Sequence, residues 1–197
     1  TECSAMCLHT SETAALENNL DNDNLGPNST KAVVTDLMQD AAQSFLQLSG
    51  EQGYRLDHPA GRATVDGRPF QSFEGSNDVL YQQVTETVLK HMRRAKVSNV
   101  GAFLRDFEPT HRAADRFDGA FDFSVEASSL SQRKSVELGR ALGRVAVMEY
   151  IVEMGDRGFR SDLISNALHV FTQEVQRLLC SYHTTPEPLP VEAYDDA

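Results

Sequence analysis

Apolar side chains recur every three or four residues along most of the chain, and no segment shows the alternation that is typical of a half-buried strand. The pattern therefore predicts an all-α protein. A first helix is expected from Thr1 to about Leu20, and a turn region rich in Asn, Asp, Gly and Pro follows at Asn18–Ser29. Ser29 or Thr30 is expected to cap a second helix, which has one apolar face and ends at Gly50.

The segment that follows the second helix, Gly50–Phe73, contains four glycines and two prolines and is expected to be irregular. A structureless stretch of this length inside a compact domain is usually functional or disordered. A third helix is predicted from about Asn77 to Lys96, with Ser76 or Asn77 as its cap. The three helices predict an antiparallel helical bundle over residues 1–96, because each carries a single apolar stripe that must be covered.

Residues 97–129 combine charged side chains with five phenylalanines, at positions 103, 107, 117, 121 and 123. One interpretation of five phenylalanines in this segment is a lipid-facing surface. The favoured interpretation is an ordered connection whose aromatic side chains pack beneath it, because the charges interleave with the phenylalanines throughout.

Two helices are predicted at Ser131–Met154 and Ser161–Tyr182, and the short turn at residues 155–158 makes them an antiparallel hairpin. Residues 97–183 are therefore interpreted as a helical extension, and the acidic, proline-containing residues 184–197 as a mobile tail. Within the first of these helices, Gly139–Arg144 has the pattern G-R-x-x-G-R. A phosphate-binding loop would need such glycines in a turn after a strand, so close packing of another helix is favoured.

Composition narrows the classes of partner. The formal net charge of −11 argues against a nucleic-acid surface, and the longest apolar runs are far shorter than a membrane span, so membrane association is not indicated. Three cysteines make no disulfide framework, and a reducing, cytoplasmic location suits them. Cys3 and Cys7 are spaced as a pair that could share a metal, but no second pair of ligands stands nearby, so no metal site is predicted.

The segment with candidate chemistry is F-E-G-S-N-D at Phe73–Asp78, immediately before the third helix. Taken alone, it places a carboxylate, Glu74, beside a glycine at a helix start. The simplest interpretation of such an acid is favourable interaction with the positive end of the helix dipole. This local pattern by itself does not distinguish a structural acid from a catalytic one.

Three further blocks precede this motif in a fixed order: Q-L-S-G-E-Q-G-Y at Gln47–Tyr54, D-H-P at Asp57–Pro59, and D-G-R at Asp66–Arg68. Together with F-E-G-S-N-D they resemble the acyl-CoA dehydrogenase family, which has Q-I-H-G-G-x-G-Y, then D-A-R, then Y/F-E-G-T before a long helix. The resemblance is strongest from about Lys31 to Lys90, and the predicted first helix would belong to the same C-terminal bundle.

The resemblance implies a function and a set of site residues. Enzymes of this family hold FAD and an acyl-CoA substrate between a helical N-terminal domain, a middle β-domain and a C-terminal helical bundle. Glu74 would be the base that removes the α-proton of the thioester while hydride leaves the β-carbon for the flavin, and a partly desolvated carboxylate suits that role. Phe73 would line the acyl pocket. Gly75, Ser76 and Asp78 would lie near the adenosine end of FAD.

The same resemblance implies an oligomer. Gln47, Gly50 and Gly53 would reach a flavin held by the neighbouring subunit, so a homodimer or homotetramer is expected. Electron-transfer flavoprotein is a candidate electron acceptor.

The chain also departs from the family pattern. Glu51 replaces a second glycine, Val65 replaces a common arginine, and Tyr81 stands where an arginine often follows the motif. Nothing in the sequence corresponds to the N-terminal or middle domain, so the flavin site is expected to be incomplete in this chain alone. The favoured hypothesis is the C-terminal domain of an acyl-CoA dehydrogenase. The alternatives are a non-catalytic helical assembly or binding module of the same superfamily, and an unrelated helical adaptor.

Overall fold

A computed structural model describes residues 24–126, 128 and 130–184. This part of the chain is helical and contains no named strand, which confirms the all-α prediction. Its elements are α2 (Leu25–Ser49), the 3-10 turn η1 (Gly50–Tyr54), α3 (Pro59–Gly67), the 3-10 turn η2 (Arg68–Gln71), α4 (Asn77–Ala95), α5 (Val100–Asp106), α6 (His111–Ala114), α7 (Gln132–Asp156) and α8 (Ser161–Thr184). The predicted first helix, Cys3, Cys7 and residues 185–197 lie outside the described residues.

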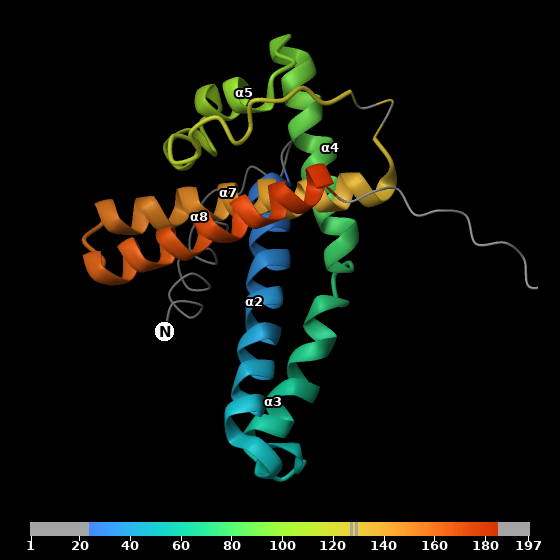
Figure 1. The fold of residues 1–197 in the computed structure, drawn as a ribbon, viewed down its shortest axis with the longest axis vertical. Coiled ribbons are helices and arrows are strands. Elements are labelled where there is room, and N and C mark those ends of the chain that lie inside the picture. The colour runs from blue at the N-terminus through green and yellow to red at the C-terminus, as the bar shows by residue number, and fades with distance from the viewer. Residues whose placement is uncertain (1–23, 127, 129, 185–197) are drawn as a thin grey trace, which may run out of the picture.

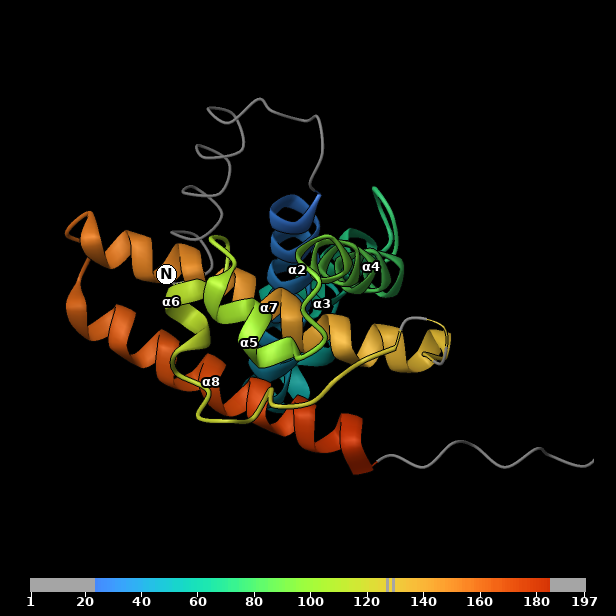
Figure 2. The ribbon, with the colours of Figure 1, turned by 90° about the horizontal axis from the view of Figure 1, so that it is seen from above.

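The helices form two antiparallel pairs that cross. Helices α2 and α4 run side by side in opposite directions, and the α7–α8 hairpin lies across them (Figure 1). Helix α3 packs along the second half of α2, so that the two form an arm that extends away from the crossing point. Seen from above, α5 and α6 cover the side of α7 that α2, α4 and α8 leave open (Figure 2). The predicted hairpin is therefore present and packs on the α2–α4 pair.

Helix α7 is the centre of the molecule. Every residue from Ala141 to Glu149 is buried, so this helix is covered on all sides rather than along one stripe. A single apolar cluster joins α2, α4, α5, α7 and α8, and its largest fully buried side chains include Tyr81, Phe117 and Phe121. The packing interpretation of the phenylalanines is thereby confirmed: three of the five are buried, and Phe107 and Phe123 pack against the same cluster.

Two of the predicted element boundaries were wrong. Helix α2 begins at Leu25, several residues before the predicted caps, because Pro27 falls in its first turn, where a missing N–H costs no helical hydrogen bond. Ser29 and Thr30 are buried inside this helix and cap nothing. The first helical turn instead closes when the Asn28 N–H donates to the Asn24 carbonyl, over 3.0 Å.

The segment Gly50–Phe73 is also not irregular, because most of it forms η1, α3 and η2. Helix α3 begins at Pro59, and the ring of His58 accepts a hydrogen bond from the Ala60 N–H at 3.2 Å. Gly50 ends α2 with a φ of 57°, whereas Gly53 and Gly61 serve close packing. A Cβ added at Gly61, for example, would lie 2.5 Å from the Arg55 carbonyl oxygen.

The G-R-x-x-G-R step on α7 packs closely against α4, as the sequence predicted. A Cβ added at Gly139 would overlap the backbone carbonyl of Tyr81, whereas one at Gly143 would reach ordinary contact at 3.4 Å from the Tyr81 ring. The backbones of α4 and α7 therefore approach each other most closely at Gly139.

We expect Gly139→Ala to lower the free energy of unfolding by about 1–3 kcal/mol, because a rigid carbonyl, rather than a flexible side chain, blocks the added methyl group. Urea denaturation of the purified chain measures this change. Gly143→Ala is the matched control on the same helix: it should be neutral or stabilising, since alanine is the better helix former by about 1 kcal/mol. Equal losses in the two variants would contradict close packing at Gly139.

Candidate functional site

The turn Phe73–Ser76 leads into α4 and has an unusual backbone conformation. Glu74 adopts a positive φ of 58°, and Gly75 follows with a φ of 102°. Glycine tolerates the left-handed region at little cost, but a glutamate there is uncommon and is kept only where its surroundings enforce it. Two consecutive positive φ values therefore mark this turn as a conformation that the rest of the fold holds in place.

Lys31 of α2 is the side chain that reaches the turn. Its Nζ donates to the Gly75 carbonyl at 2.7 Å and to Oδ1 of Asn77 at 2.9 Å. Burial lowers the pKa of the Lys31 ammonium, whereas the nearby carboxylates of Asp36 and Glu74 act to raise it. The ammonium thus connects α2 to the turn on one side and to the first residue of α4 on the other.

Asp36, five residues further along α2, gathers donors from two other elements. Its Oδ1 accepts from Nδ2 of Asn77 at 2.6 Å and from Nε2 of Gln71 at 2.8 Å, and its Oδ2 accepts from the Tyr81 hydroxyl at 2.7 Å. Asn77 also donates to Thr35 Oγ1 at 2.9 Å. Burial and the adjacent Asp36 carboxylate raise the pKa of Tyr81. The phenol is therefore held protonated as a donor.

The extension contributes two arginines to the same neighbourhood. Arg140 of α7 pairs with Asp78 at 2.9 Å, and its guanidinium lies 5.7 Å from the centre of the Tyr81 ring. Arg144, one turn further on, is buried and pairs with Glu174 of α8 at 2.8 Å. The start of α4 is thus attached to the α7–α8 hairpin by charge as well as by apolar packing.

The predicted site residues fall into two groups. Phe73, Glu74, Gly75, Ser76 and Asp78 lie together and exposed at the start of α4.

The second group lies at the other end of α2. Gln47 and Gly50 are exposed there, and Gly53 is buried in η1. Gln47 is sixteen residues further along α2 than Lys31, which is about 24 Å at 1.5 Å per residue. The structure therefore does not bring the two predicted groups together within one chain.

The chemistry of the donor set at the turn suits one part of FAD. The Ser76 side chain makes no capping hydrogen bond, and the Asp78 side chain is 66% exposed although it pairs with Arg140. A hydroxyl and a carboxylate suit the hydroxyl and amino groups of an adenosine, whereas a carboxylate does not suit a pyrophosphate. The predicted contact of these residues with the adenosine end of FAD agrees with their chemistry and stays a prediction.

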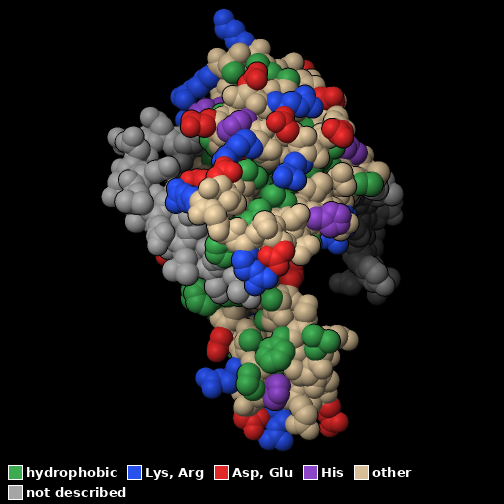
Figure 3. All heavy atoms as spheres, turned by 90° about the vertical axis from the view of Figure 1, so that its left-hand side faces the viewer, with side chains coloured by type: hydrophobic (Ala, Val, Ile, Leu, Met, Phe, Trp, Pro, Cys, Tyr) green, Lys and Arg blue, Asp and Glu red, His purple; other side chains and the backbone are tan. Residues whose placement is uncertain are grey.

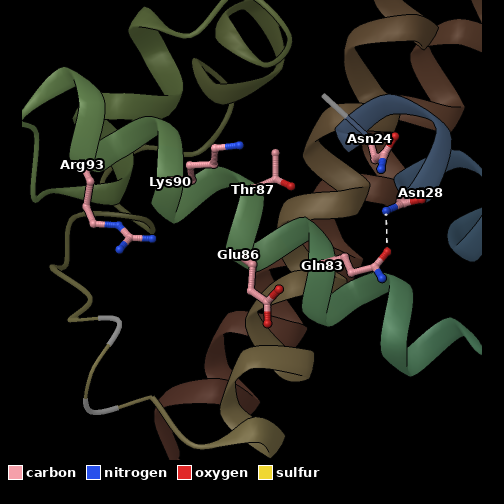
Figure 4. A pocket seen from close by; sticks show the side chains of 7 residues that line it. All are labelled: Asn24, Asn28, Gln83, Glu86, Thr87, Lys90 and Arg93. Atoms are coloured by element: carbon pink, nitrogen blue, oxygen red, sulfur yellow. Dashed lines mark hydrogen bonds between the residues drawn. The ribbon is translucent and has the colours of Figure 1, made fainter. Parts of the chain in front are cut away.

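Two hollows lie elsewhere on the molecule. An apolar groove between α2, α3 and η2 is lined by Met38, Ala41, Ala42, Phe45, Ala63, Asp66, Gly67 and Phe70. Hydrophobic side chains gather on the lower lobe that this arm forms (Figure 3). A polar hollow between the start of α2 and α4 is lined by Asn24, Asn28, Gln83, Glu86, Thr87, Lys90 and Arg93, and Asn28 donates to Gln83 across it at 2.9 Å (Figure 4). Neither hollow includes Glu74.

Two classes of site are absent from the described part of the chain. Within residues 24–126 and 130–184, no group of three or more His, Cys, Asp or Glu side chains could hold a metal ion. Over the same ranges, no helix combines the length and apolar character needed to cross a membrane.

Comparisons with known proteins indicate which family the chain is similar to. Residues 1–89 match the family model described as acyl-CoA dehydrogenase, C-terminal domain. A search of curated proteins and a search of solved structures gave no match. Residues 1–89 are therefore similar to this C-terminal domain, and the predicted resemblance is confirmed over that range. The match ends inside α4, so α5–α8 lie beyond it.

The residues that hold the turn, Lys31 and Asp36, were not among the predicted site residues. They are charged side chains at half-buried positions of α2, and a charge among inward-packing positions is the signal that could have indicated them. Tyr81 was noted only as a departure from the family pattern. The structure shows that its hydroxyl serves Asp36.

We expect Tyr81→Phe to reduce the free energy of unfolding by about 1–3 kcal/mol, because a half-buried carboxylate loses one of its donors. Chemical denaturation at neutral pH measures the loss. Tyr54→Phe is the control, since Tyr54 is 75% exposed and its change should stay within about 0.5 kcal/mol.

The hydrogen bond between Tyr81 and Asp36 also predicts that the stability of the fold depends on pH. The folded chain holds the Tyr81 proton above its ordinary pKa of 10.0, so this contribution to stability is complete below pH 10.0 and is lost as the pH rises further. Tyr81→Phe should flatten that alkaline decline, and an unchanged slope would contradict the burial of the Tyr81 phenol beside Asp36.

Proposed function

We propose that this chain is the C-terminal part of a flavin-dependent acyl-CoA dehydrogenase, in which Glu74 removes the α-proton of an acyl-CoA thioester. The observation that carries the proposal is the turn at Glu74: a carboxylate in a left-handed conformation, exposed at a helix start and held from a second helix by Lys31. A carboxylate that only stabilised a helix end would need neither the positive φ nor the cross-helix support.

The reaction assigned to this site transfers one proton and one hydride away from the acyl chain. The α-carbon–hydrogen bond breaks and its proton passes to a carboxylate oxygen of Glu74, while a double bond forms between the α- and β-carbons. FAD, when bound, would accept the hydride that leaves the β-carbon. Glu74 therefore has to face the α-carbon in its ionised form, and Phe73, 64% exposed beside it, would contact the acyl chain.

The exposure of Glu74 has a consequence for the assembly. A carboxylate is a stronger base where water is excluded, and in this chain the Glu74 side chain faces solvent. Substrate, cofactor or other parts of a larger assembly would have to cover it. The exposed apolar residues of the α2–α3 arm, among them Leu48 and Tyr54, lie too far along α2 to cover Glu74 of the same chain.

A non-catalytic assembly module of the same superfamily is the second candidate. It is favoured by the Asp78–Arg140 pair, since a residue expected to face the cofactor here meets an arginine of the extension. Glu51, beside Gly50 of η1, also places a negative charge where the resemblance would lead one to expect a pyrophosphate.

In the flavin-loaded assembly, we expect Glu74→Gln to leave flavin binding intact and to slow flavin reduction by an acyl-CoA about a hundred- to ten-thousandfold, because glutamine cannot accept the proton. Stopped-flow absorbance of the flavin measures the rate. Glu86→Gln, an exposed carboxylate further along α4, is the matched control and should react at the wild-type rate. Near wild-type reduction by Glu74→Gln would favour the non-catalytic module.

We also expect the 197-residue chain alone to bind FAD poorly and to show no dehydrogenase activity. The turn offers donors for the adenosine end, and the residues near Gln47 lie about 24 Å away along α2. Titrating the purified chain with FAD and recording the visible spectrum tests this expectation. A stable stoichiometric yellow complex would show that the chain holds a complete site.

A further inference from the structure

We infer that Lys31 is a positioning residue for the Glu74 turn, acting through the Gly75 carbonyl and the Asn77 amide, and this inference rests on the proposed role of Glu74. Its Nζ bridges two groups of the turn, one on either side of Ser76, at 2.7 Å and 2.9 Å. A single ammonium with three donors can hold both acceptors at once.

The contact fixes the backbone that carries the carboxylate. With Glu74 at φ 58° and Gly75 at φ 102°, the Gly75 carbonyl is directed at α2, where the ammonium meets it. Asn77 is buried and is held from α2 a second time, by Thr35 and Asp36. Removing the ammonium would leave Asn77 anchored and release the carbonyl immediately after Glu74. The expected effect is therefore on the direction of Glu74 and not on the start of α4.

The electrostatic surroundings couple Lys31 to Glu74. The negative groups that act on the ammonium are Asp36 of its own helix and Glu74 of the turn. Asp36 is already hydrogen-bonded by Asn77, Gln71 and Tyr81.

The charges that α4, α7 and α8 bring to the neighbourhood are paired among themselves. Asp78 meets Arg140, and Arg144 meets Glu174. Lys31 is the cation that bonds the turn directly, and the Glu74 carboxylate acts on its ammonium.

The test uses the flavin-loaded assembly and compares Lys31→Met with Lys31→Arg. Met keeps the length and packing of the side chain but cannot donate, so flavin reduction should slow about ten- to a hundredfold, as misplacement of a reacting group predicts, with little change in acyl-CoA affinity. Arg keeps two donors and the charge and should recover most of the rate.

Lys90→Met is the matched control, because Lys90 is an exposed lysine of α4 that lines the polar hollow away from the turn. It should leave the rate of flavin reduction unchanged. A wild-type rate in Lys31→Met would overturn the inference, as would a loss that Lys31→Arg does not recover.

A second readout needs no flavin. In the full chain, the pKa of Lys31 can be followed by NMR of its side-chain ammonium, and Glu74→Gln should lower it, because one of the charges that raise it is removed. Glu86→Gln should not change it. An unchanged Lys31 titration in Glu74→Gln would show that the two groups do not face each other, and it tests the inference even if Lys31→Met fails to fold.

The two proposals fail in different ways. If Glu74→Gln abolishes flavin reduction while Lys31→Met reduces its flavin at the wild-type rate, Lys31 has no positioning role and the function of Glu74 stands. If Glu74→Gln reduces its flavin at the wild-type rate, the proposed function itself is wrong. In that case a Lys31 titration that responds to Glu74→Gln would still establish the contact but not its catalytic purpose.

Discussion

The arrangement of the helices depends on one half-buried carboxylate. Asp36 lies on the inner side of α2, and a charge in that position has to be hydrogen-bonded or it destabilises the fold. Its donors come from η2 through Gln71 and from α4 through Asn77 and Tyr81. These hydrogen bonds therefore fix the position of α4 along α2. They also hold the segment that joins the two helices against α2. The Glu74 turn lies inside that segment, and Lys31, one and a half turns earlier on α2, holds it from the same side.

The extension is part of this arrangement and not an appendage to it. Tyr81, which departs from the family pattern, presents its hydroxyl to α2, its ring to Arg140 and its backbone carbonyl to Gly139 of α7. A long arginine side chain at this position would leave no such flat ring for Arg140. The apolar core runs from α2 and α4 into α7 and α8 without a break. The residue that differs from the family pattern is thus the one through which α2, α4 and the extension meet.

The sequence predicted those parts of the fold that depend on local pattern. Helices α4, α7 and α8 were predicted to within a few residues because each repeats apolar residues over many turns. The start of α2 and the helix α3 were missed, because Pro27 and the glycines near Gly61 were interpreted as breakers, whereas their role is set by the helix start and by tertiary packing. The same limit applies to the site: Glu74 was identified from its motif, but Lys31 meets Gly75 from 44 residues away, and no local pattern encodes that contact.

The backbone of the Glu74 turn is held in place, but its side chains are not covered. This difference indicates what the chain would contribute to a larger enzyme. The backbone around Glu74 is held by Lys31 and Asn77, while its side chain and that of Phe73 face solvent. A base that must meet a substrate needs a fixed backbone and an open carboxylate, and the chain supplies both. What it does not supply among its described residues is a cover over the carboxylate. Gln47 and Gly50 of the same chain cannot provide one, because they lie at the far end of α2. Under the proposed function, the Lys31 end of α2 would therefore support Glu74 of its own site. The Gln47 end would contact the flavin site of a neighbouring subunit.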